Sequence, residues 1–298
     1  MRVSSHQFHL TSISNIQYNA ERFNESSTQL ATNIRIAKPS DDPLGAVMLL
    51  NLDTELNSLE QYKSNIQSID FSLSQQEVKL TGIVDQIYLL QSLITTAADG
   101  SMGPEELKAI GQELSVTFPG IVDLLNGTDN DGKYYFSGSE TTTKPFDLDG
   151  AGNYVYNGDD SVRDVQVTPD SRVASNITGD NLDPNATFLN AMKDYLVVME
   201  NPTVGGVGDE SRLMIDELAG FLQTITGEVT KIGGIISSLD SLADSNLDIT
   251  AVTSNLRDDI SAVDYPSAQI KMNESMAAYE STMQVYAKVT SLSLFSFI

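Results

Sequence analysis

The chain of 298 residues contains no cysteine and only two histidines. The lack of cysteine excludes disulfides, thiolate metal ligands and cysteine nucleophiles. His6 and His9 lie three residues apart with no further ligand close in sequence, which favours a surface role over a metal site. The N-terminal stretch lacks the apolar centre of a signal peptide, and no apolar run reaches the ~18 residues of a membrane span. We therefore expect neither a conventional secretion signal nor membrane insertion.

Basic residues are also scarce, with 17 Lys and Arg against 41 Asp and Glu and a net charge of −24. Nucleic-acid binding needs clustered basic side chains, so nucleic acid is excluded as a partner. Residues 1–50 carry balanced charges and residues 250–298 are close to neutral, so the middle holds most of the negative charge. An acidic middle predicts a solvated surface, whereas near-neutral ends can be buried against other protein.

Motifs for chemistry are missing as well. The glycines at 205–208 lack the Lys-Ser/Thr of a phosphate loop, and no nucleophile motif is present. Residues 129–133 and 147–153 each carry two acids of a calcium loop, but the glycine falls early and no terminal glutamate follows, so turns are favoured. We predict no catalytic residue, no cofactor and no metal ligand, hence no enzyme.

What is present is heptad periodicity. A first apolar stripe runs from Ile13 to Ile34, and a second from Leu59 to Ile94. A helix over about residues 44–98 would be roughly 80 Å long at ~1.5 Å per residue, so it must pack along another long helix. Gly103-Pro104 predicts the start of a further helix that ends at Asn126-Gly127, with a kink at Pro119.

The C-terminal half repeats the pattern. A stripe runs from Leu218 to Leu239 and resumes from Ile249 to Val263 after an expected irregularity near Asn246. The break at 264–266 precedes a last stripe from Met272 to Tyr286. Between the halves, residues 127–185 contain short β-rich runs (133–138, 153–158 and 163–167) separated by turn signals, followed by a short helix at 187–200 that Pro202 ends.

These patterns predict a mainly α protein: a long antiparallel coiled-coil or helical-bundle rod formed by both chain halves, with a small β-rich outer domain in the middle. The predicted domains are an N-terminal arm with a proline joint (1–43), the N-terminal half of the rod (44–126), the β-rich domain with its short helix and linker (127–208), the C-terminal half of the rod (209–264) and a C-terminal arm (265–298).

The joint between the first two helices, residues 38–45, could in principle hold a catalytic carboxylate pair. A local structural role is better defined, because Pro43 forces an extended conformation on Asp42, as an N-cap requires, and suits the first helical position. We expect Lys38-Pro39 to stop the preceding helix in the same way. The predicted joint and cap residues are Pro39, Asp41, Asp42, Pro43 and Pro266.

Each arm is one helix with a single apolar stripe, which is marginal in water on its own. The arms can bury one stripe against each other, and the remaining apolar surface, including the tail, would then be buried by neighbouring subunits. The predicted assembly interface comprises Ile13, Ile16, Phe23, Leu30, Ile34, Met272, Met276, Tyr279, Met283, Tyr286, Leu292, Leu294, Phe295, Phe297 and Ile298.

The sequence at residues 33–49, NIRIAKPSDDPLGAVML, resembles the N-terminal motif of the bacterial flagellin family, and residues 260–272, ISAVDYPSAQIKM, resemble its C-terminal region. Flagellins commonly carry Asn-Ser-Ala-x-Asp-Asp-Ala at the joint, where this chain has KPSDDP. This joint, YYFSGS at 134–139 and the tail LSLFSFI at 292–298 are closer to the hook-associated members of the family. Pro266 stands where the family often has alanine.

The resemblance implies an extracellular structural subunit, exported unfolded through the flagellar type III apparatus. Implied partners are hook-associated protein 1, flagellin, further copies of the chain, and an export chaperone on the C-terminal arm. Two alternatives stay open: a short filament flagellin, and an extracellular calcium-dependent adhesin or enzyme carried by the β-rich region.

Overall fold

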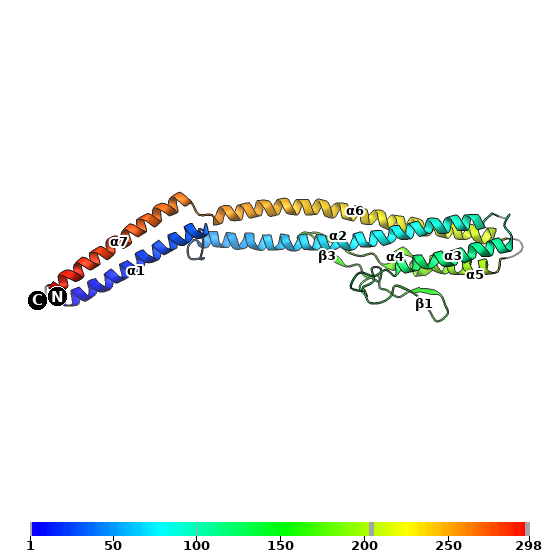
Figure 1. The fold of residues 1–298 in the computed structure, drawn as a ribbon, viewed down its shortest axis with the longest axis horizontal. Helices are drawn as coiled ribbons and strands as arrows, with labels where there is room; N and C mark the ends of the chain where they lie inside the picture. Colours follow the sequence, from blue (N-terminus) through cyan, green and yellow to red (C-terminus); the bar gives the residue numbers. More distant parts are fainter. Residues whose placement is uncertain (1, 100, 203–205, 296–298) are drawn as a thin grey trace. The chain divides into compact units, whose positions relative to one another are not determined.

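The computed structural model describes residues 2–99, 101–202 and 206–295. Long helices dominate: α1 (Arg2–Thr32), α2 (Pro43–Ala97), α3 (Pro104–Leu125), α6 (Gly208–Ser261) and α7 (Tyr265–Phe295). The chain forms two compact units (Figure 1). We call residues 1–58 with 248–298 the arm unit, and residues 59–247 the core unit; α2 and α6 contribute to both. The mainly α prediction with a small β-rich insertion is confirmed, and the finer domain boundaries stay a prediction.

The core unit is built on the predicted second stripe. From Ile66 to Ile94, the apolar stripe residues of α2 are at most 4% exposed. They pack with buried residues of α3, of α5 (Thr187–Glu200) and of α6. Phe188 of α5 stacks on Phe221 of α6 with ring centroids 4.0 Å apart. The heptad spacing predicted this seam because each large apolar residue recurs on the same face of the helix.

The one polar residue in the stripe is Gln76, which is 1% exposed. Its Nε2 donates to the carbonyls of Ser72 and Ser175, and its Oε1 accepts from the backbone N–H of Ile177 at 3.0 Å. A buried amide must find such partners, because an unsatisfied polar group in the interior is costly. Gln76 therefore attaches the β-rich segment to α2.

The β-rich segment consists of two antiparallel strand pairs. β1 (Phe146–Leu148) pairs with β2 (Tyr154–Tyr156), aligning Phe146 with Tyr156. β3 (Asp164–Gln166) pairs with β4 (Arg172–Ala174), aligning Asp164 with Ala174. A short turn of helix, α4 (Gly179–Leu182), and a 3-10 turn, η1 (Pro184–Ala186), lead into α5, whose bounds match the predicted short helix.

Several expectations about single elements were wrong. The run 133–138 is not a strand; it makes one bridge, Thr128 to Tyr134, and Phe136 is buried in the core instead. Helix α3 includes Pro119 in its interior, and the expected kink there stays a prediction. Helix α6 runs without a break past Asn246, whose buried side chain donates to the carbonyl of Leu59 at 3.1 Å.

The first helix ends earlier than Lys38-Pro39, which corrects the predicted stop. Helix α1 ends at Thr32, and Asn33 adopts the left-handed conformation with φ of 58°. Asparagine tolerates this conformation better than most residues, so it can close a helix in place of glycine. Residues 33–42 then form a loop, which we call the joint loop.

Candidate assembly site

The joint loop is closed by the two acids that the sequence singled out. The Oδ2 atom of Asp41 accepts from the backbone N–H groups of Ala37 and Lys38, at 3.1 and 2.8 Å. The N–H of Asp41 donates to the carbonyl of Lys38 at 3.0 Å. Asp41 therefore fixes the turn that contains Pro39.

Asp42 is the N-cap of α2, as predicted. Its Oδ1 accepts from the N–H of Gly45 at 3.0 Å, and Pro43 is the first helical residue. Its Oδ2 accepts from Nη1 of Arg35 at 3.0 Å. The bond from the Gly45 N–H, followed by the Arg35 bond, lowers the pKa of Asp42 below its ordinary value, so the cap is ionised at neutral pH.

Arg35 was missed by the sequence analysis, although it organises the joint. Its Nη2 donates to the carbonyl of Ile260 at 3.0 Å, and its backbone N–H donates to the carbonyl of Ser261 at 2.7 Å. Both carbonyls belong to the last turn of α6, where helical oxygens lack partners within the helix and a cation is favourable. Arg35 thus links the joint loop, the start of α2 and the end of α6.

Two further contacts tighten the same place. Ile34 forms an antiparallel bridge with Ala262, directly beside the Arg35 bonds. The buried Ile36 lies so near α2 that a Cβ on Gly45 would come within 2.5 Å of both its Cδ1 and Oδ2 of Asp42. A larger residue at position 45 would therefore have to displace the side chains of Ile36 and Asp42.

Across the joint, Asp264 marks the beginning of α7. Its carbonyl accepts from the N–H of Ala268 at 2.9 Å, and the hydroxyl of Ser267 donates to its Oδ2. Pro266 is the second residue of α7. The predicted break is present but lies at 262–264 instead of 264–266, because proline is tolerated at the start of α7, where the first helical N–H groups need no intrahelical partner.

Helices α1 and α7 lie side by side and antiparallel (Figure 1), with Cα atoms of the two helices within 8 Å. Nδ2 of Asn19 donates to Oγ1 of Thr282 at 3.0 Å. The ring of His9 stacks on that of Tyr286 with centroids 5.1 Å apart. Among the described residues, the buried positions of this seam are small: Ser12, Ser26, Ala268 and Ser275. Small side chains allow the two backbones to approach closely.

This seam divides the predicted interface residues into two groups. Half-buried between the arms are Ile16, Phe23, Leu30, Met272, Tyr279 and Tyr286. Exposed in the chain by itself are Ile13 (38%), Ile34 (44%), Met276 (45%) and Met283 (43%). The side chains of Leu292, Leu294 and Phe295, and the whole of Phe297 and Ile298, lie outside the described residues.

The exposed group has neighbours that the sequence analysis did not name. Further exposed apolar residues of the arms are Phe8, Leu10, Tyr18, Ile270, Val285 and Val289. We call these residues, together with Ile13, Met276 and Met283, the outer apolar residues. A soluble chain rarely leaves so many large apolar side chains in water on two neighbouring helices without a partner that covers them.

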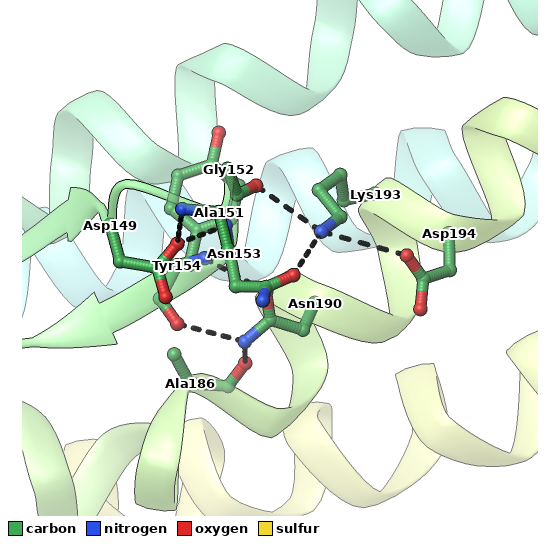
Figure 2. Close-up of polar contacts among 9 residues, drawn as sticks. All are labelled: Asp149, Ala151, Gly152, Asn153, Tyr154, Ala186, Asn190, Lys193 and Asp194. Carbon is green, nitrogen blue, oxygen red and sulfur yellow. Dashed lines mark hydrogen bonds and ion pairs between the residues drawn. The ribbon is translucent and has the colours of Figure 1, made fainter.

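The loop between β1 and β2, one of the two stretches compared with a calcium loop, forms a turn (Figure 2). Oδ1 of Asp149 accepts from the N–H groups of Ala151 and Asn153, at 2.9 and 2.8 Å. Nζ of Lys193 on α5 donates to the carbonyl of Gly152 at 3.2 Å and to Oδ1 of Asn153 at 2.5 Å. The carbonyl oxygen of Gly152 and Oδ1 of Asn153 are therefore both bonded to an ammonium group.

Asn190 holds the same hairpin on α5. Its Oδ1 accepts from the N–H of Tyr154, and its Nδ2 donates to the carbonyls of Tyr154 and Ala186 (Figure 2). The loop at 129–133 has a similar turn, in which Oδ1 of Asp129 accepts from the N–H groups of Asp131 and Lys133. Within residues 2–99, 101–202 and 206–295 no cluster of three potential metal ligands occurs. In the same residues, no helix is long and apolar enough to span a membrane.

Comparison with known proteins agrees with this architecture. Residues 3–141 match the family described as the bacterial flagellin N-terminal helical region. In its long paired helices and in this matched region the chain is similar to flagellin-type proteins.

Over its full length the chain is similar to flagellar hook-associated protein 3 of Salmonella typhimurium, with 23% identity covering 99% of each chain. A solved flagellar hook-associated protein from Vibrio parahaemolyticus is 25% identical, with a TM-score of 0.69 that covers 74% of this chain and 100% of that one. The flagellar junction protein FlgL from Legionella pneumophila shares the fold at 17% identity, with a TM-score of 0.55 over 71% of this chain and 100% of its own.

Proposed function

We propose that this chain is an extracellular structural subunit of the bacterial flagellum that joins the hook to the flagellin filament. The full-length similarity to hook-associated protein 3 and the likeness to a flagellar junction protein support the assignment. The proposed assembly mechanism rests on one observation about the arm helices α1 and α7. Small residues are buried where the two helices pair, whereas the outer apolar residues are exposed to water.

In this role the outer apolar residues bind neighbouring subunits. Burying one large apolar side chain contributes roughly 1.5–3 kcal/mol, so a handful of them per subunit gives a strong drive to assemble. Contacts of this kind between unlike faces repeat from subunit to subunit and build a tube or a ring. The near-neutral arms suit this task, because an interface between copies of an acidic chain must avoid like-charge repulsion.

The joint sets the direction in which the arms leave the rest of the arm unit. Asp42 begins α2 at a fixed residue, and Arg35 attaches the same loop to the end of α6. Both arms are thereby anchored at one place. Hook-associated protein 1 on one side and flagellin on the other are the proposed neighbours, with export by the type III apparatus and a chaperone on the C-terminal arm beforehand.

Deleting residues 292–298 tests the assembly role of the tail. The truncated chain should keep the melting temperature of the full chain, because the core unit is untouched, yet fail to join hook and filament, so that flagellin escapes into the medium. The matched control replaces Val116, an exposed apolar residue of α3, by serine and should behave as wild type in both assays. A truncated monomer that melts much earlier would place the tail in the intramolecular core and refute its role in assembly.

A further inference from the structure

The sequence contains two Asn-Gly pairs, Asn126-Gly127 and Asn157-Gly158. A glycine after asparagine leaves its backbone nitrogen unobstructed and conformationally free to reach the asparagine side chain. We propose that Asn157 is a site of spontaneous deamidation in the folded protein, and that the fold protects Asn126.

The reaction needs only water. The backbone nitrogen of Gly158 attacks Cγ of Asn157, a new N–Cγ bond forms and the Cγ–Nδ2 bond breaks. Nδ2 leaves as ammonia, taking with it the proton lost by the Gly158 nitrogen. One water molecule then opens the resulting succinimide at either of its two carbonyl groups, which gives aspartate or isoaspartate at position 157.

At Asn126 both reacting groups are held. Its Nδ2 donates to the carbonyl of Phe146 and its Oδ1 accepts from the N–H of Phe146, each at 2.9 Å. The N–H of Gly127 donates to the carbonyl of Leu124 at 3.1 Å. Attack would require these bonds to break and the end of α3 to separate from β1, so the reaction is suppressed.

At Asn157 these restraints are missing. The residue is exposed, and neither its side-chain amide nor the N–H of Gly158 is hydrogen-bonded to any residue that the structure describes. Only the backbone N–H of Asn157 is engaged, donating to the carbonyl of Pro145 at 2.8 Å. The attacking nitrogen and the leaving amide are thus both available.

The two products differ in what they do to the loop. Aspartate keeps the backbone path and adds a negative charge beside Asp159 and Asp160. Isoaspartate lengthens the main chain next to Gly158, where even a Cβ would lie 2.4 Å from Oη of Tyr156 and 2.9 Å from Cα of Ser137. The isoaspartate form must therefore displace the loop and weaken the bonds from Tyr156 Oη to the carbonyls of Phe136 and Asp159.

The test is to age the folded full chain in mildly alkaline buffer and map tryptic peptides by mass spectrometry, with isoaspartyl methyltransferase labelling. Lys133 and Arg163 bound the peptide that contains Asn157, because Pro145 blocks cleavage after Lys144. Lys108 and Lys133 bound the peptide that contains Asn126. We expect deamidation at Asn157 to be roughly tenfold faster or more, the factor that the three hydrogen bonds at Asn126 impose at about 0.5 kcal/mol each.

Two controls separate the fold from the local sequence. In guanidinium chloride both pairs should react at similar rates, because the protecting bonds are lost. Asn157→Gln should keep the fold and lose the labelled product, because a longer side chain cyclises far more slowly. Equal rates at the two positions in the folded chain would overturn the proposal. It would equally fail if the ratio of rates were unchanged by unfolding, or if Asn157 stayed intact while the unfolded chain reacted.

Discussion

Asp42 Oδ2 accepts a hydrogen bond from Arg35 Nη1 at 3.0 Å, while the other oxygen of the same carboxylate caps α2. One side chain thus performs two tasks, and each can be removed separately. The joint loop fixes the residue at which α2 begins, and it holds the end of α6 through Arg35.

Replacing Asp42 by asparagine should preserve the cap, because an amide oxygen accepts from the Gly45 N–H as a carboxylate does. Replacing it by leucine removes the acceptor and should lower the helix content and melting temperature of the arm unit, with weaker motility. Circular dichroism and a swimming assay measure both. Equal loss in the two variants would show that the ion pair with Arg35, not the cap, carries the effect.

Replacing Arg35 by leucine should loosen the end of α6, because the carbonyl of Ile260 loses its guanidinium donor, although the backbone N–H of residue 35 can still donate to Ser261. Hydrogen exchange followed by mass spectrometry should show faster exchange in residues 255–262 and unchanged protection of the core unit. Arg212→Leu is the control, since its partner Asp209 is 92% exposed and such surface pairs contribute little. Unaltered exchange in residues 255–262 would refute the anchoring role of Arg35.

Asp183 predicts a pH dependence in the core unit. The carboxylate is 2% exposed and accepts from the N–H groups of Phe188 and Leu189, at 2.8 and 3.1 Å. Burial raises its pKa to about 6, in spite of these bonds, from the ordinary 3.8. The folded chain therefore binds this proton more tightly than the unfolded chain does, so this group makes the protein more stable as the pH falls from about 6 towards 3.8.

Asp183→Asn removes that contribution. The difference in unfolding free energy between wild type and variant should shift in favour of wild type by up to roughly 3 kcal/mol over this interval. Denaturant titrations at a series of pH values measure it, and the difference cancels the opposite effect of Asp42, Asp147 and Asp159, whose pKa values are lowered. A difference that stays flat, or favours wild type more as the pH rises, would contradict this account of Asp183.

Calcium should not matter to the β1–β2 hairpin. The melting temperature should be the same in EDTA and in calcium, because Lys193 already occupies the oxygens of Gly152 and Asn153. Lys193→Met should lower the melting temperature by the loss of these bonds, again without a response to calcium. A higher melting temperature of the wild-type chain in calcium would contradict this prediction. It would favour the alternative of a calcium-dependent adhesin or enzyme carried by the β-rich region.

The sequence allowed correct predictions for features that depend on residues close together in the chain. The stripe of α2 was read correctly because large apolar residues repeat on one face, and the cap at Asp42 because Pro43 restricts it. Residues 187–200 carried enough signal to give both ends of α5. Hydrogen bonds between residues far apart in the sequence have no pattern in the sequence that would predict them. Asn246 bonds to Leu59 and Arg35 bonds to Ile260, and neither contact could be inferred from spacing.

The arms show a subtler limit. Heptad counting finds the large apolar residues, whereas the structure pairs α1 with α7 partly through Ser12, Ser26 and Ser275, since small residues permit close approach. Consequently Ile13, Met276 and Met283 are exposed although they share the stripe pattern. From one sequence the contacts within a chain and the contacts between chains have the same period, and only the fold separates them.

The most direct test of the proposed function is reconstitution on purified hooks that carry hook-associated protein 1. Flagellin should polymerise on these hooks only after this chain has been added, and a double variant of the outer apolar residues, Met276→Ser with Met283→Ser, should bind poorly while melting as wild type does. Filament growth without the chain, or full activity of the double variant, would contradict the claim that these arms join hook and filament.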